Sequence, residues 1–435
     1  MEGLYAINIR KIIATIREEG WAFIFICMYL FFEYVRPQSI YPSLDIVPWV
    51  PIILFLSGLV LFLSGDFKAQ PNKLNKLIVC YGLVVLLSSS FSQYPLISFS
   101  KLRVFFDWFI IYFLIVLIIK NEKRFFIFLL SFLIYSLKMS QHGFLSWLKR
   151  GFSYSSWGVT GAPGWFHNSG EVGIQMCIYV PIAIAFIFAT YRFMSKTKLL
   201  FFLLMPFTGI GTAVASSSRG ALVGLAFAGI RPLIIRLRLF LIGSIVLSVV
   251  ATLTIMSIPE ESKKRFEVAG SDRTSLHRID RWNDGLDALQ KYPVLGVGFE
   301  AWSEYYPRKY QIEVEGSKLL HNIFLQCVTE LGYTGLIIFV FMILACFANT
   351  RKVRKLSHGK EDQFLAIMSY GFDAALLGFI GSGFFVTVLY YPFFWIHCAL
   401  TTCLYTAAQK KFTSPSVTEV QDRIVPAMRN SNGYN

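Results

Sequence analysis

Long apolar runs and short polar breaks alternate along almost the whole chain. About a dozen runs are long enough to cross the hydrocarbon core of a bilayer, which takes roughly 17 to 25 helical residues. The pattern predicts membrane-spanning helices near residues 20–35, 46–64, 77–92, 103–119, 125–140, 171–190, 199–215, 219–235, 238–257, 319–347, 364–388 and 390–407. We therefore expect an all-α polytopic membrane protein with about 12 transmembrane helices. Some runs are short, so broken or re-entrant helices are an open alternative.

Basic residues concentrate in alternate breaks, which predicts the orientation of the chain. With the N-terminus in the cytoplasm, the cytoplasmic breaks are those near residues 68–76, 120–124, 192–198, 231–238 and 351–360, and all of them are basic. We expect both termini to be cytoplasmic. The predicted layout places transmembrane helices 1–9 in residues 1–256, a large periplasmic loop in 257–318, helices 10–12 in 319–407 and a disordered cytoplasmic tail in 408–435.

Composition excludes a soluble protein, because 55% of the 435 residues are hydrophobic and only 15% are charged. The net charge of +15 does not indicate a nucleic-acid partner. The predicted loop 257–318 holds ten Lys/Arg and eleven Asp/Glu, so the surplus lies mainly in the cytoplasmic breaks. The seven cysteines lie in or beside apolar runs, which indicates neither a disulfide framework nor a metal cluster. The first run lacks a small-residue cleavage pattern and is interpreted as a retained helix.

Within the predicted loop, apolar residues recur at three- to four-residue spacing at Leu276, Ile279, Trp282, Leu286 and Leu289. Arg278 and Arg281 lie on a neighbouring face. Ser271 or Asp272 could cap the start, and Tyr292-Pro293 followed by two glycines ends the pattern. We expect a short amphipathic helix on the membrane surface.

Polar residues enter the apolar run that begins at Leu319 at three positions, His321, Asn322 and Glu330. An imidazole with an ordinary pKa of about 6.5 can accept a proton from a hydroxyl near neutral pH. The plainer alternative is a histidine at a helix start that bonds to neighbouring backbone. Glu330 is about half a turn out of phase with His321, at about 100° per residue. It is better interpreted as a structural partner of a neighbouring helix.

Arg219 interrupts an apolar stretch at the predicted outer end of two spans. It either extends to the lipid headgroups or binds a phosphate through two parallel hydrogen bonds. Arg36, Arg278 and Arg281 are also predicted to face outward. Several arginines in one outer cavity would suit a lipid-linked diphosphate.

A second group of outward polar residues lies in the segment 161–171. Trp165, His167 and Asn168 could bind sugar, or Asn168-Ser169-Gly170 could simply start the next helix. Three carboxylates in or beside apolar spans are interpreted as paired within the bundle or near an interface, rather than as an ion pathway. They are Glu33, Asp107 and Asp373.

The residues from His321 resemble a family signature: His321-Asn322, nine residues, Gly332, two residues, Gly335. This spacing is similar to that of bacterial O-antigen ligases. The segment Ser218 to Leu222, and Arg281-Trp282 leading to Pro293-Val-Leu-Gly-Val-Gly298, resemble the core of the wider O-antigen ligase and polymerase superfamily. The resemblance covers roughly residues 200–345. Residues 31–38 are similar to a branch associated with exopolysaccharide or protein O-glycosylation loci. The family often has leucine four residues after the arginine, where this chain has Val223.

The resemblance implies a metal-independent, inverting glycosyltransferase of the GT-C type at the outer face of the inner membrane. Its donor would be a glycan on undecaprenyl diphosphate, with membrane lipids around it and no cofactor. Arg219 and Arg281, with Arg36 and Arg278, would hold the diphosphate. His321 would be the general base, with Asn322 beside it. The acceptor could be a lipid A core sugar, a protein side chain or another polymer.

Two alternatives to a ligase stay open. A polymerase of the same superfamily would join repeat units on the same carrier. A transporter or flippase would also have twelve spans with both ends inside. No convincing repeat relates the two halves, and the polar groups gather toward the outer surface rather than the midplane, which disfavours transport.

Overall fold

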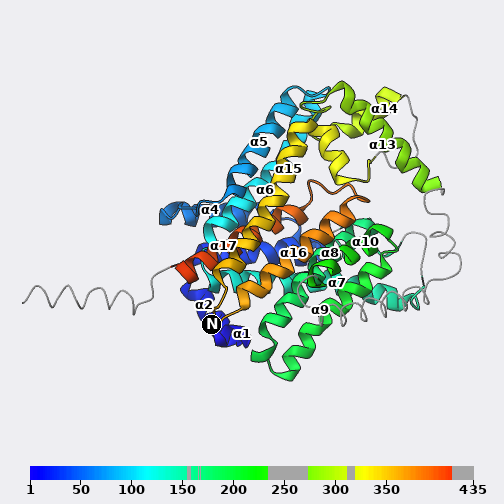
Figure 1. Ribbon diagram of the computed structural model, residues 1–435. Helices are drawn as coiled ribbons and strands as arrows, with labels where there is room; N and C mark the ends of the chain where they lie inside the picture. The colour runs from blue at the N-terminus through cyan, green and yellow to red at the C-terminus, as the bar shows by residue number, and fades with distance from the viewer. Residues whose placement is uncertain (154–157, 165, 167, 234–272, 311–318, 414–435) are drawn as a thin grey trace, which may run out of the picture.

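The protein is described here by a computed structural model, which covers residues 1–153, 158–164, 166, 168–233, 273–310 and 319–413 (Figure 1). The regular elements in these ranges are helices. In chain order they are α1 (Glu2–Tyr5), α2 (Ile9–Glu18), α3 (Trp21–Leu30), the π-helix η1 (Phe31–Val35), η2 (Pro37–Ser39), η3 (Pro42–Leu44), α4 (Trp49–Ser64), α5 (Lys73–Ser90), α6 (Pro95–Ile118), α7 (Glu122–Lys149), α8 (Ser169–Thr190), η4 (Tyr191–Phe193), α9 (Lys196–Ala215), α10 (Arg219–Leu233), α13 (Arg273–Lys291), α14 (Trp302–Tyr310), α15 (Ile323–Leu356), α16 (Phe364–Gly383) and α17 (Pro392–Thr413).

The predicted spans in the described ranges fall on helices, which confirms an all-α polytopic membrane protein. Six described helices are long and apolar enough to cross a membrane: α5, α7, α8 with η4, α9, α15 and α16. The predicted span 238–257 and the predicted caps Ser271 and Asp272 lie outside the described residues. The number of twelve spans and the division into loop and helices stay predictions. Helix α17 runs to Thr413, so residues 408–413 of the predicted tail are helical, and residues 414–435 are not described.

The centre of the bundle is α8, which packs along α16, α9 and α10 (Figure 1). Helix α15 packs against α5, α16 and α17. Many large apolar side chains point outward instead, for example Phe55 at 68% exposure and Phe207 at 61%. A surface of this kind suits lipid contact, because lipid tails are as apolar as these side chains.

A second, smaller hydrophobic core joins α13 and α14 to α15 at the end of the molecule away from the N-terminus (Figure 1). It contains Leu289, Val297 and Trp302 from the predicted loop. Leu320, just before α15, and Val328, within α15, complete it. The predicted loop helix is confirmed as α13, and it ends at Lys291 as its stop signals predict. The loop segment is therefore packed on the bundle rather than free of it.

Helix α15 is broken at Gly332, whose backbone has φ 67° and ψ −171°. The segment 293–298 fills the break. Its Val297 and Gly298 N–H groups donate to the carbonyls of Thr329 and Glu330 at 2.9 and 3.2 Å. In return, the Tyr333 N–H donates to the carbonyl of residue 293 at 2.8 Å. The backbone groups that the break would leave unpaired are thus satisfied, as an apolar environment requires.

Glycine is needed on both sides of this contact. A Cβ at Gly332 would lie 2.2 Å from the Val294 carbonyl oxygen, and one at Gly296 would lie 2.4 Å from the Glu330 carbonyl carbon. Both glycines also have positive φ, which side-chain-bearing residues rarely adopt. The glycine in the histidine signature is therefore explained by a helix break.

We expect Gly332→Ala to destabilise the protein by about 2 kcal/mol or more, because the methyl group meets backbone that cannot move away without losing hydrogen bonds. The matched control is Gly229→Ala in α10, where a Cβ meets nothing within 4 Å. That control should be neutral or slightly stabilising. Thermal unfolding of both variants in the same detergent measures the difference, and equal midpoints would contradict the role of the break.

Candidate functional site

His321 is held on both sides by the fold. Its backbone N–H donates to Thr387 Oγ1 at 2.8 Å. The backbone has φ 52°, a left-handed conformation that is uncommon outside glycine. On its N-terminal side, Trp282 Nε1 donates to the Leu320 carbonyl at 2.8 Å. A non-glycine residue held in a strained conformation by its surroundings is typical of functional sites.

Asn322 is the N-cap of α15. Its Oδ1 accepts from the N–H groups of Phe324 and Leu325 at 2.9 and 3.2 Å. The amide is buried, so the oxygen of this residue serves the helix start. The substrate-binding role predicted for Asn322 stays a prediction.

Arg278 and Arg281 lie on the face of α13 that points toward α15. Gly285 lies on the same face, where a Cβ would lie 3.2 Å from Thr329 Oγ1 of α15, so the two helices are in close contact. The guanidinium carbon of Arg281 is 6.0 Å from the centre of the Tyr306 ring. Its buried Nε has no hydrogen-bond partner among the described residues. Sequence periodicity predicted that both arginines share one face of this helix, and their binding roles stay predictions.

Arg278 and Arg281 influence the protonation of His321. Burial lowers the pKa of His321, and the positive charges of Arg278 and Arg281 lower it further, to about 4. The imidazole is therefore neutral at pH 7 and has a lone pair available to accept a proton.

The apolar residues that recur along α13 are partly buried in the second core and partly exposed. Leu289 is buried and Trp282 packs on the second core, but Leu276, Ile279 and Leu286 are 44–48% exposed. The predicted position of this helix on the membrane surface stays a prediction.

Residues 384–391, here called the central loop, contact His321 and lie against Gly220, the residue after Arg219. The predicted span 364–388 ends too late, because α16 stops at Gly383 and the chain then leaves the helix. Hydropathy cannot detect this end, since the loop is itself apolar and is buried among helices. The central loop contacts His321 through Thr387 and α15 again through Leu389, whose N–H donates to Gln326 Oε1 at 3.3 Å.

Two tyrosines of the central loop bind carboxylates. The Tyr390 hydroxyl donates to Glu330 Oε2 at 2.8 Å, and the Tyr391 hydroxyl donates to Glu171 Oε1 at 3.0 Å. Glu330 is thus a structural partner, as predicted, although its side chain binds the central loop rather than a neighbouring helix. Sequence reasoning missed Thr387, Tyr390 and Tyr391, because they lie inside an apolar run that resembles the end of a span.

Arg219 starts α10 beside the same loop. Its neighbour Gly220 lies against Phe385, where a Cβ would be 2.7 Å from the Phe385 Cβ. Phe385 is two residues from Thr387, which binds His321. The starts of α10 and α15 therefore meet the same loop from different helices.

Arg36 and Asn168 have structural contacts. Arg36 pairs with Glu33 Oε1 at 3.3 Å and donates to the Gly164 carbonyl. Asn168 Oδ1 accepts from the Gly170 N–H at 2.8 Å and caps α8, as the helix-start alternative predicted. Trp165 and His167 lie outside the described residues. The binding roles of all four residues stay predictions.

The three carboxylates predicted to be paired are paired. Besides the Arg36–Glu33 pair, Arg354 lies 2.9 Å from Asp373 and Arg103 lies 3.9 Å from Asp107. A further carboxylate, Glu300, was not singled out from the sequence. Burial raises the pKa of Glu300, and the positive charge of Lys101 partly offsets this. Within the described ranges, no three His, Cys, Asp or Glu side chains are grouped so as to hold a metal ion.

Comparison with known proteins supports the sequence resemblance. A family model described as O-antigen ligase matches residues 199–340. Exopolysaccharide production protein ExoQ of Rhizobium meliloti (strain 1021) is 27% identical over 114 residues, which is 23% of this chain and 25% of that protein. The chain thus aligns with about a quarter of that relative's length. The predicted resemblance to the O-antigen ligase superfamily is confirmed, and the matched residues include Arg219, Arg278, Arg281 and His321.

We expect Thr387→Val to speed hydrogen exchange at the His321 amide about fivefold, because one hydrogen bond of about 1 kcal/mol is lost. Thr387→Ser keeps the hydroxyl and should exchange like the native protein. Mass spectrometry of peptides that contain residue 321 measures the rate. Equal rates in the Val and Ser variants would show that Thr387 does not hold His321.

Proposed function

We propose that this chain, whose residues 199–340 match the O-antigen ligase family, is a membrane glycosyltransferase. It would transfer a glycan from undecaprenyl diphosphate to an acceptor hydroxyl at the periplasmic face of the inner membrane. The observation that carries the proposal is the position of a largely buried, neutral histidine next to two arginines. This combination offers a base for a hydroxyl and cations for a diphosphate.

Arg278 and Arg281 would bind the diphosphate of the donor, with Arg219 approaching from the start of α10. A guanidinium can bind phosphate oxygens with two parallel hydrogen bonds. Like charges close together in a partly buried site are unfavourable unless an anion binds between them. The same cations would stabilise the charge that develops on the leaving diphosphate.

Donor binding would also activate the base. In the free protein, burial and then the charges of the two arginines lower the pKa of His321 to about 4, which makes the imidazole a weak base. A bound diphosphate brings negative charge that offsets the arginines, so the pKa of His321 rises toward its ordinary value. A general base works best when its pKa is close to the working pH. The histidine therefore becomes effective when the donor is in place.

The chemical step is a single displacement with inversion. The acceptor hydroxyl oxygen forms a bond to the anomeric carbon while the bond from that carbon to the diphosphate oxygen breaks. The electron pair of the broken bond leaves with undecaprenyl diphosphate. His321 takes the hydroxyl proton.

A polymerase acting on the same donor is the second candidate. The similarity to a protein named for exopolysaccharide production favours it. The two differ only in the acceptor, which is another lipid-linked repeat for a polymerase. Purified protein given one lipid-linked repeat unit should yield a ladder of products if it polymerises, and a single product on a separate acceptor if it is a ligase.

We expect His321→Ala to lower the rate of glycan transfer about 10²- to 10⁴-fold, which is the usual contribution of a general base. The matched control is His358→Ala, an exposed histidine just beyond the other end of α15. Transfer from purified lipid-linked glycan, measured at equal amounts of folded protein, compares them. Full activity in the His321 variant would overturn the assignment of the base.

Arg281→Gln tests the electrostatic effect separately. Removing a nearby cation favours the protonated histidine, so the pKa of His321 rises above about 4 in the free protein. The acid limb of the pH profile of kcat/KM should therefore move to higher pH. Arg308→Gln, on the exposed face of α14, should leave the limb in place. A limb that does not move in the Arg281 variant would contradict the coupling.

A further inference from the structure

Helix α2, near the N-terminus, has an exposed apolar strip. One side of the helix packs on the bundle through buried Thr15 and the partly buried Ile12 and Ile16. Next to that side, Ile9 and Ile13 are 69% and 46% exposed. A soluble surface gains nothing from isoleucines in this position, whereas a membrane surface does.

Exposed cations border this strip. At 100° per residue, Arg10 and Arg17 lie beside Ile13 on the side away from the bundle. Both side chains are exposed, and neither forms an ion pair with another described residue. Apolar residues that enter the acyl region, flanked by cations at headgroup level, are typical of a helix in the plane of the membrane surface.

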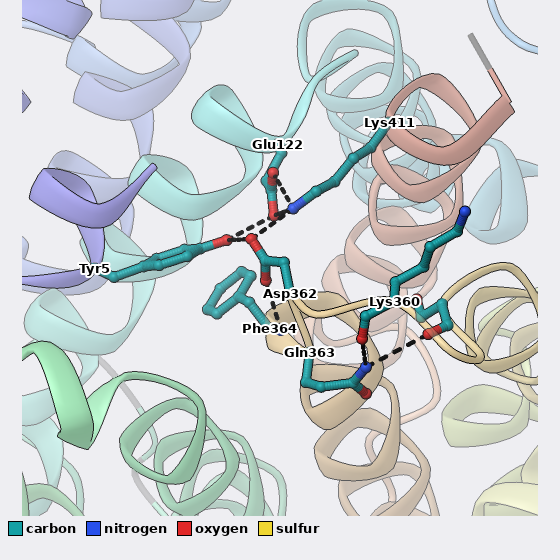
Figure 2. Close-up of polar contacts among 8 residues, drawn as sticks. Tyr5, Glu122, Lys360, Asp362, Gln363, Phe364 and Lys411 are labelled. Atoms are coloured by element: carbon teal, nitrogen blue, oxygen red, sulfur yellow. Dashed lines mark hydrogen bonds and ion pairs between the residues drawn. The ribbon is translucent and has the colours of Figure 1, made fainter. Parts of the chain in front are cut away.

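A polar cluster fixes the chain just before α2 to the bundle (Figure 2). The Tyr5 hydroxyl lies 2.8 Å from both Glu122 and Asp362, and Lys411 Nζ lies 2.7 Å from each of these carboxylates. Burial raises the pKa of Asp362, but the hydrogen bonds from Lys411, the Phe364 N–H and Tyr5, together with the charge of Lys411, outweigh burial and lower the pKa overall. Both carboxylates are thus held by Lys411 and Tyr5. Just past the end of α2, Glu19 pairs with Arg124 at 2.5 Å.

A cavity of about 340 Å³ opens next to this cluster. Its lining includes Glu19, Asn121, Glu122, Lys123, Lys410 and Lys411. The two glutamates are already paired with Arg124 and Lys411, whereas Lys123 and Lys410 are exposed and form no ion pair with the described residues. The cavity therefore has an excess of positive charge.

We propose that this cavity and α2 together bind an anionic phospholipid. The phosphate of the headgroup would lie between Lys123 and Lys410, and Ile9 and Ile13 would lie among the acyl chains. The cavity lies where α17 ends and where α7, a helix long and apolar enough to cross a membrane, begins. Basic pockets between transmembrane helices are suited to anionic headgroups. Glu19, the C-cap of α2, lines the cavity, and the exposed apolar strip on the same helix favours a lipid over a soluble anion. The proposal does not depend on the proposed glycosyltransferase activity.

The test is lipid binding to the full chain in detergent, followed by native mass spectrometry. Phosphatidylglycerol should bind at least about tenfold more tightly than phosphatidylcholine. Each basic residue near an anionic lipid contributes roughly fivefold in affinity, so Lys123→Gln with Lys410→Gln should weaken phosphatidylglycerol binding about 25-fold. The matched control is Lys149→Gln with Lys309→Gln, which removes two exposed lysines from the other end of α7 and from α14.

Two further variants keep the test decisive if the lysine variant folds poorly. Lys123→Arg with Lys410→Arg should retain binding, and Ile9→Ser with Ile13→Ser should weaken the binding of both lipids. Equal binding of the two lipids, or equal losses in the lysine variant and its control, would overturn the proposal. Displacement of the lipid by equimolar glycerol 3-phosphate would show a soluble-anion site instead. Binding seen only after deletion of residues 414–435 would make that segment the natural occupant.

Discussion

The break in α15 is the constraint on which the end of the molecule away from the N-terminus depends. A helix interrupted at Gly332 leaves carbonyls at Thr329 and Glu330 that must be paired in an apolar environment. The segment 293–298 is the partner that satisfies them, and it follows directly after α13. The position of α13 is therefore set by backbone hydrogen bonds. Arg278 and Arg281 lie close enough to lower the pKa of His321 as a consequence of that position.

Charged side chains are arranged differently at the two ends of the molecule. At the end that holds α13, burial and two arginines lower the pKa of His321, and we propose that these arginines bind a diphosphate during a reaction cycle. At the end near the termini, two carboxylates, a tyrosine and Lys411 pair with one another, which leaves Lys123 and Lys410 for an anion from outside the chain (Figure 2). Both sites join segments that are far apart in the sequence. The loop segment and the bundle core are needed for the first, and both ends of the described chain for the second.

Much of the fold could be predicted, because hydropathy reports burial in lipid or protein, and helix-start and helix-stop residues act locally. The end of α13 at Lys291 and the cap at Asn168 follow from such local signals. The central loop could not be predicted, since an apolar loop buried in protein has the same composition as a span. The same limit applies to the single residue Arg36. Its outward position could be inferred from the predicted topology, but its contacts with Glu33 and Gly164 form only in the folded structure.

The sequence by itself determined that the chain is an all-α membrane protein, that a histidine starts a late apolar helix, and that two arginines share a face of an amphipathic helix. These properties depend on composition and on spacing along one element, which short-range rules describe. Only the tertiary structure decided that the arginines face the histidine, that Thr387 holds its backbone, and that Asn322 is used as a cap. Those contacts join residues forty or more positions apart, or choose between two partners for one side chain. Such choices follow from packing, which spacing along the chain does not specify.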